Sequence, residues 1–326
     1  MRHAHFAFGA DYLPLNHGSY GAHPTAVRAA HLALRAEAEA APDPFIVLNF
    51  SKRLEAQRAA AASLLNCPAG ELAFAPNATT GIDTVLRNLP FTDGDVVLCY
   101  EAVYGAVAHG ARWIAEYHRR LGVQVGVEVV PVAIPQSDDA FVSAMVDGAR
   151  RVNAQPGRRV RLAIVDTIVS LPGVRVPFER LVPALQAEGA LVLVDGAHGI
   201  GQIDIDLAAL RPDFFVSNIH KWLFVPRGCA ALYVPERHQH LIRTTLPTGW
   251  GFKPLDPDDE GAVGQTGFPD SFEFTGAFSS CTAWLSLLFF CFCAGFLLLH
   301  REGRLCANYL TNTTNSDQRR DTLALR

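Results

Sequence analysis

The sequence contains no block of basic residues. Lys and Arg together number 28 against 32 Asp and Glu, and the formal net charge is −4. Proteins that bind nucleic acid usually carry a concentrated positive patch, so we expect no nucleic-acid partner. Internal repeats and long low-complexity linkers are also absent, while hydrophobic residues make up 49% of the chain. The composition therefore favours a globular protein with a large core.

Cysteine is present, but no C-x-x-C pair occurs among the seven. The one close pair, Cys291 and Cys293, lies in an apolar run without a neighbouring histidine. Zinc sites need closely spaced Cys and His ligands, so we predict buried or unpaired thiols and no metal. The first residues also lack the apolar core of a secretory leader, and we therefore expect a cytoplasmic protein.

Apolar runs alternate with amphipathic stretches along most of the chain. Runs such as 95–100, 161–166 and 191–194 end in polar residues, as buried strands do, and stretches with helical spacing lie between them. This alternation predicts an α/β fold with a doubly wound, mainly parallel sheet. Ligands bind such sheets at the carboxyl ends of the strands.

Two of these strand ends carry an acid and an amine. The run 191–194 ends in Asp195, and the run 214–216 leads into His220 and Lys221. A lysine amine can hold the aldehyde of pyridoxal phosphate as a Schiff base, and a carboxylate can keep its pyridine nitrogen protonated. Each residue alone is usually structural, but their order along the chain predicts a pyridoxal phosphate site.

Two further strand ends add polar or aromatic groups. After 72–74 the chain passes through small hydroxyl residues into a helix, where backbone N–H groups and the helix dipole can bind phosphate. An ordinary N-cap by Asn77 or Thr79 is the alternative. Tyr104 can stack on a heteroaromatic ring, or it can be a core tyrosine.

Five motifs in order resemble the class V aminotransferases of fold type I, in the branch of isopenicillin N epimerase-like proteins and hercynylcysteine sulfoxide lyases. The matching segments are LNHGSYGAHP at 15–24, FAPNATTGIDTVLRN at 74–88, EAVYGAV at 101–107, VDGAHGIGQIDIDL at 194–207 and SNIHKWLFVPRGCAALYVP at 217–235. The resemblance extends over 10–276. It implies that the cofactor is pyridoxal phosphate and that the substrate is an amino acid.

The resemblance also implies roles for individual residues. Lys221 is similar to the Schiff-base lysine, Asp195 to the partner of the pyridine nitrogen, and His198 to the residue at the ring hydroxyl. The other implied cofactor contacts are Ala78 and Thr79 at the phosphate, His220 near it, Tyr104 on the ring and Ser170 beside His198. The resemblance places Asn16 and His17 on the substrate side, and in a homodimer it places Trp250 and Thr275 near the neighbouring subunit's site.

The reaction type stays open at this point. Loss of a β-sulfur group would make the protein a C–S lyase for a cysteine-derived substrate such as a cysteine sulfoxide conjugate, and the LNHGSYG and NIHKW segments favour this branch. Epimerisation, cysteine desulfuration and transamination would use the same lysine. Outside enzymes, the alternative is a non-catalytic, membrane-associated remnant or interaction protein.

The sequence predicts three regions. These are a substrate-side loop at 1–24, a cofactor-binding large domain at 25–276 and a tail at 277–326 without family resemblance. The family continues with a small C-terminal domain that usually supplies an arginine for the substrate carboxylate, so the activity of this chain stays open. Residues 282–299 carry no charge and are long enough for a membrane span. The abrupt break favours a truncated or mis-spliced product over a membrane anchor.

Overall fold

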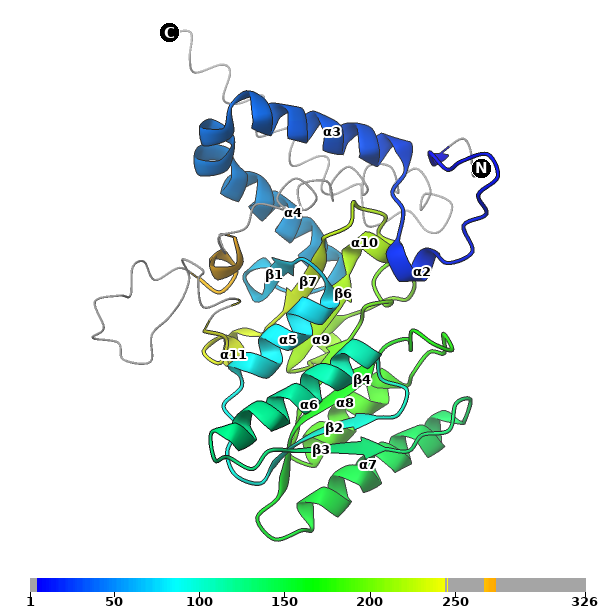
Figure 1. The fold of residues 1–326 in the computed structure, drawn as a ribbon, viewed down its shortest axis with the longest axis vertical. Coiled ribbons are helices and arrows are strands. Elements are labelled where there is room, and N and C mark those ends of the chain that lie inside the picture. Colours follow the sequence, from blue (N-terminus) through cyan, green and yellow to red (C-terminus); the bar gives the residue numbers. More distant parts are fainter. Residues whose placement is uncertain (1–4, 244, 246–266, 274–326) are drawn as a thin grey trace, which may run out of the picture.

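The computed structural model describes residues 5–243, 245 and 267–273 (Figure 1). Trp250, Thr275 and the predicted span at 282–299 lie outside these residues. Within the described ranges, no helix is both long and apolar enough to cross a membrane.

In this part of the chain, seven strands form one sheet in the order β1-β7-β6-β5-β4-β2-β3. The strands are β1 (Leu72–Ala75), β2 (Asp95–Tyr100), β3 (Gly126–Val130), β4 (Arg159–Asp166), β5 (Leu191–Asp195), β6 (Phe214–Asn218) and β7 (Ala230–Tyr233). Four neighbouring pairs are parallel, and β7 runs antiparallel to both β1 and β6. The predicted α/β class with a mainly parallel sheet is confirmed.

Helices cover both faces of the sheet. They are α5 (Ala78–Asn88), α6 (Gly105–Arg120), α7 (Asp138–Asn153) and α8 (Phe178–Ala187). α5 packs on α6 and α7 packs on α8. From β1 through β2 to β3 the chain crosses the sheet in one direction, and from β3 through β4 to β5 it crosses back. Because the crossovers are right-handed, the pair α5 and α6 lies on one face and the pair α7 and α8 on the other.

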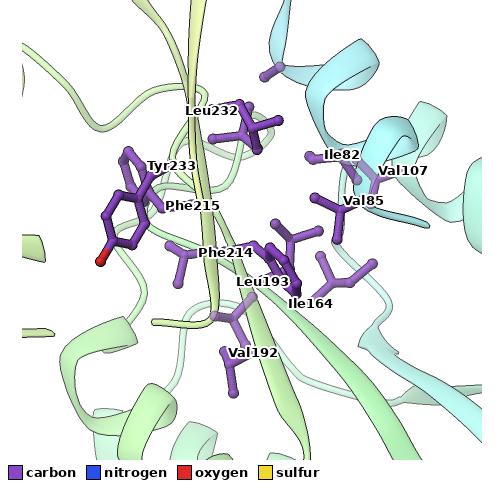
Figure 2. Close-up of a cluster of buried hydrophobic side chains, with 14 of the residues drawn as sticks. Ile82, Val85, Val107, Ile164, Val192, Leu193, Phe214, Phe215, Leu232 and Tyr233 are labelled. Atoms are coloured by element: carbon purple, nitrogen blue, oxygen red, sulfur yellow. The ribbon is translucent and has the colours of Figure 1, made fainter. Parts of the chain in front are cut away.

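The central strands are apolar on both faces because each face is covered. Every residue of β2 and β6 is buried. Figure 2 shows Ile82 and Val85 of α5 and Val107 of α6 facing the side chains of the central strands, among them Leu193. Burying one such side chain contributes about 1.5–3 kcal/mol, so this core fixes the positions of the strand ends.

An N-terminal arm of helices precedes the sheet. It consists of α2 (His17–Tyr20), α3 (Thr25–Ala40), the π-helical turn η1 (Pro44–Asn49) and α4 (Phe50–Leu65). The predicted substrate-side loop at 1–24 thus contains the short helix α2, which contacts α10 (Ile219–Trp222). The remaining short elements are η2 (Ala69–Glu71), α9 (Leu207–Leu210), α11 (Glu236–Gln239) and η3 (Asp270–Phe272).

Candidate functional site

The candidate site forms where β4, β5 and β6 end side by side. Asp166 and Asp195, the last residues of β4 and β5, are partners in the register of the sheet. β6 lies parallel to β5, and α10 begins directly after it. The fold therefore brings Lys221 of α10 to the same edge as Asp195, as the positions of β6 and α10 in Figure 1 indicate.

The amine of Lys221 contacts the imidazole of His198. Lys221 Nζ lies 3.0 Å from His198 Nε2. Burial lowers the pKa of Lys221, although the charge of Asp195 acts in the opposite direction. Burial, helped by the charge of Lys221, lowers the pKa of His198 to about 4. Both groups therefore favour their neutral forms more than they would in water.

Asp195 is a buried acid with few partners. Its side chain is almost inaccessible, and its Oδ1 accepts a hydrogen bond of 2.9 Å from the backbone N–H of Ala197. Among the described residues, none donates a hydrogen bond to Oδ2. Burial raises the pKa of Asp195 to about 6, against the opposing effects of Ala197 and Lys221. A cationic ring nitrogen would supply the missing partner, so this acid fits a pyridinium.

A second buried acid, Asp166, extends the site beyond the predicted residues. The hydroxyl of Tyr100 donates a hydrogen bond to Asp166 Oδ2. Burial and the neighbouring Asp195 raise the pKa of Asp166 well above its usual range. Two adjacent buried carboxyls rarely ionise together, so Asp166 keeps the proton and Asp195 carries the charge.

The predicted phosphate turn begins α5. Asn77 is its N-cap, because its Oδ1 accepts a 2.8 Å hydrogen bond from the N–H of Thr80. The N–H of Ala78 donates to Asn218 Oδ1 at 2.9 Å. Thr79 is exposed in the first turn. The N-cap alternative is therefore realised by Asn77, and the N–H of Ala78 already has a protein acceptor.

The remaining predicted cofactor contacts differ in their surroundings. His220 is buried, and its Nδ1 lies 2.6 Å from the carbonyl oxygen of Cys229, to which it donates. Tyr104 is half exposed at the start of α6, so it is not a core tyrosine. Ser170 is exposed after β4, and within the described ranges no hydrogen bond joins it to His198.

The arm docks onto α10 through its backbone and one ring. His17 Nε2 lies 2.7 Å from the carbonyl oxygen of Lys221. Gly21 has a φ of +66°, and a Cβ there would lie 2.0 Å from the carbonyl oxygen of His220, so only glycine fits. Asn16 accepts a hydrogen bond of 2.7 Å from Ser19 Oγ and stays exposed. The ring of His17 is thus bound to α10, and its place on the substrate side stays a prediction.

A metal centre finds no support in the described part of the chain, where no group of three or more His, Cys, Asp or Glu side chains could hold an ion.

Known proteins resemble this chain at the level of family and fold. The model of the family "Aminotransferase class-V" matches residues 46–274. The L-cysteine desulfhydrase-like protein lolT1 of Epichloe uncinata is 41% identical over 76% of this chain and 54% of its own length. The hercynylcysteine sulfoxide lyase of Schizosaccharomyces pombe is 31% identical over 76% of this chain and 60% of its own. The chain thus spans little more than half the length of these relatives.

A solved structure shares the fold. A complex between the cystine C–S lyase C-DES and its product cysteine persulfide superposes with a TM-score of 0.72, at 22% sequence identity, over 92% of this chain and 74% of the other.

Proposed function

Because the chain belongs to the class V aminotransferase family, we propose that it binds pyridoxal phosphate and cleaves a carbon–sulfur bond of a cysteine-derived amino acid. The observation that carries the proposal is the meeting of an amine, an imidazole and a buried carboxylate at the ends of β5 and β6. The names of the relatives described above, a desulfhydrase-like protein and a sulfoxide lyase, support sulfur chemistry.

The residues present fit the cofactor at both ends of its ring. Lys221 Nζ would hold the aldehyde, and Asp195 Oδ2 would accept from the protonated ring nitrogen. The phosphate would lie at the start of α5, and the ring would lie under Tyr104. The proposed contacts are, at the phosphate, Ala78, Thr79 and His220, and, at the ring hydroxyl, His198 and Ser170.

The chemistry then divides between the cofactor and the protein. When bound, pyridoxal phosphate stabilises negative charge that develops at Cα of the amino acid. The neutral amine of Lys221 removes the proton from Cα, and the electron pair of that bond expels the sulfur group from Cβ. The lowered pKa of Lys221 favours this step because an ammonium cannot accept a proton.

We also propose that the enzyme works as a homodimer. Several apolar side chains in the arm and just before it are exposed in the single chain: Tyr12, Leu13, Leu15 and Tyr20. A second subunit would cover them and would place Trp250 and Thr275 near the neighbouring site. Sedimentation of the full chain should give twice the mass of 35.4 kDa; a monomer at all concentrations would contradict the dimer.

A product assay tests the reaction class. The full chain with pyridoxal phosphate is incubated with cysteine, cystine and a cysteine sulfoxide conjugate, and pyruvate and the released sulfur product are measured. We expect equal amounts of the two, with no release by Lys221→Ala and full release by the exposed-site control Lys52→Ala.

The alternatives leave other products. Racemised substrate without sulfur release would favour epimerisation and contradict the lyase. A 2-oxo acid that retains its sulfur would favour transamination.

A further inference from the structure

A tryptophan beside the lysine forms the third member of a hydrogen-bonded chain. The indole Nε1 of Trp222 lies 3.4 Å from His198 Nδ1, and His198 Nε2 lies 3.0 Å from Lys221 Nζ. Trp222 and Lys221 are adjacent in α10, whereas His198 comes from the loop after β5. The imidazole is therefore held between two side chains of one short helix.

The chemistry of the three groups fixes the position of the ring proton. An indole N–H can only donate, so Nδ1 of His198 must accept. A neutral imidazole then carries its proton on Nε2. The pKa of His198, lowered to about 4, keeps the ring neutral over the physiological range. The tautomer is thus set by Trp222.

This tautomer is incompatible with a protonated lysine. An ammonium has three N–H donors and no acceptor, so it cannot accept the proton of His198 Nε2. A neutral amine has a lone pair and can accept it. The hydrogen bond at 3.0 Å therefore exists in this tautomer only when Lys221 is uncharged.

The arm holds both rings in place. A Cβ at Gly18 would lie 3.2 Å from Trp222 Cζ2 and 3.3 Å from His198 Cε1, so the glycine backbone packs directly on the two rings. The ring of His17 lies 5.0 Å from that of Trp222, centroid to centroid. The arm therefore packs against both the Trp222 and the His198 ring.

Other ionisable groups around the pair act differently. Asp195 favours the ammonium form of Lys221. His17 contacts only the backbone carbonyl of Lys221, and His220 is bound to Cys229. Arg227 donates to the carbonyl oxygen of Gly21. None of them replaces the indole at His198 Nδ1.

We propose that Trp222 is a positioning residue: its indole N–H fixes His198 in the tautomer with the proton on Nε2, and this tautomer holds Lys221 as the free amine. The proposal deepens the proposed function and rests on it, because Lys221 is the residue expected to hold the cofactor and move the proton at Cα. Without the indole donor, His198 can carry its proton on Nδ1 instead. Its Nε2 then has a lone pair that accepts a hydrogen bond from the Lys221 ammonium and stabilises it.

Competitive acetylation tests this directly on the full chain, after hydroxylamine has released any pyridoxal phosphate that the isolated protein holds on Lys221. The chain has only three lysines, Lys52, Lys221 and Lys253, so peptide mass spectrometry resolves each of them. The pH midpoint of acetylation reports the proton affinity of the amine, and it does not depend on how easily the reagent reaches it. The exposed Lys52 is the internal reference.

Two changes at position 222 are compared with one control. Trp222→Phe removes the donor with part of the ring, and 3-benzothienylalanine at the same position keeps the shape and removes only the N–H. In both, the acetylation midpoint of Lys221 should move to higher pH. The shift should correspond to an increase of about fivefold in the proton affinity of the amine, which is the size of one neutral hydrogen bond. Trp113→Phe, which changes the half-exposed ring stacked on Tyr117, should leave it unchanged.

The outcomes separate this inference from the proposed function. An unchanged Lys221 midpoint in the benzothienylalanine protein would overturn the role of Trp222, even if the wild type binds the cofactor. A raised midpoint in a chain that never forms an adduct with pyridoxal phosphate would support the tautomer and contradict the proposed function alone.

Discussion

Buried acids lie at both ends of the parallel strands, which are called here the amino edge and the carboxyl edge of the sheet. The acid at the amino edge has several hydrogen-bond donors, and the acid at the carboxyl edge has few. At the amino edge, Asp213 accepts hydrogen bonds from His238 at 2.7 Å, Gln186 at 2.9 Å and the backbone N–H of Val192 at 2.8 Å. Burial would raise its pKa, but these bonds lower it. At the carboxyl edge, the N–H of Ala197 is the one donor to Asp195 among the residues that the structure describes, and the pKa of Asp195 is raised. One acid is satisfied by the fold, and the other is left for a ligand.

The size of a cavity does not make this distinction. A cavity of about 720 Å³ lies at the amino edge, between α8 and α9, and Asp213, Gln186 and Arg237 are among its lining residues. These polar groups bond to one another. The carboxyl edge is instead marked by Asp195, whose Oδ2 accepts no hydrogen bond from the described residues.

The largest expected effect is on stability, when the satisfied acid is removed. Asp213→Ala leaves His238, Gln186 and a strand N–H without their acceptor, so the free energy of unfolding should fall by about 3 kcal/mol. Urea unfolding measures it. Asp204→Ala, an exposed acid lining the same cavity, is the control and should change stability by less than about 0.5 kcal/mol. Equal losses would remove the contrast between the edges.

The next effect is a pH dependence of opposite sign for the two acids. The pKa of Asp195 is close to 3.8 in the unfolded chain and about 6 in the folded protein, because burial raises it. Its stabilising contribution is therefore full below the unfolded pKa and is lost as pH rises to about 6, by roughly 2–3 kcal/mol. The contribution of Asp213, with a lowered folded pKa, is present above the unfolded pKa and is lost as pH falls.

Asp195→Asn isolates the first of these effects. Between pH 4 and pH 6, wild type should lose stability relative to this variant in urea titrations. A constant difference in stability across that interval would show that Asp195 has an ordinary pKa and does not differ from Asp213 in the way described.

A smaller loss is expected at the Tyr100 and Asp166 pair. Tyr100→Phe leaves the buried Asp166 carboxyl without its donor, at a cost of about 1–2 kcal/mol in the free energy of unfolding. Tyr117→Phe, on the exposed side of α6, should cost almost nothing. If the two variants unfold at the same urea concentration, the buried hydrogen bond contributes no stability.

The smallest effect separates capping from phosphate binding at α5. Asn77→Ala removes the N-cap and should cost about 1 kcal/mol of stability. Thr79→Ala should leave stability nearly unchanged and weaken the affinity for pyridoxal phosphate. Fluorescence titration with the cofactor measures the affinity, and equal affinities of Thr79→Ala and wild type would exclude Thr79 from the phosphate site.

The sequence predicted the elements and the strand ends, because both follow from local pattern. The bounds of β2 and β5 agree with the apolar runs at 95–100 and 191–194, and Asp195 and Lys221 meet because parallel strands end at one edge. Contacts that depend on strand order were not predictable. β3 is the outermost strand of the sheet, so its neighbour β2 pairs on the other side with β4. This pairing brings Tyr100 of β2 to Asp166 of β4.

Hydrogen bonds between segments far apart in the sequence were also not predictable. His17 reaches the carbonyl oxygen of Lys221 across 204 positions, and Ala78 bonds to Asn218 across 140. No periodicity in the sequence encodes such pairs. The motif NIHKW did contain Trp222, but its contact with His198 depends on the placement of the loop after β5.

Borohydride reduction of the full chain with pyridoxal phosphate, followed by peptide mass spectrometry, tests most directly whether one lysine at this edge holds the cofactor. A single phosphopyridoxyl adduct on Lys221, lost in Lys221→Ala and weakened in Asp195→Asn, is the expected result. Adducts spread over Lys52 and Lys253, or an adduct indifferent to Asp195, would contradict it.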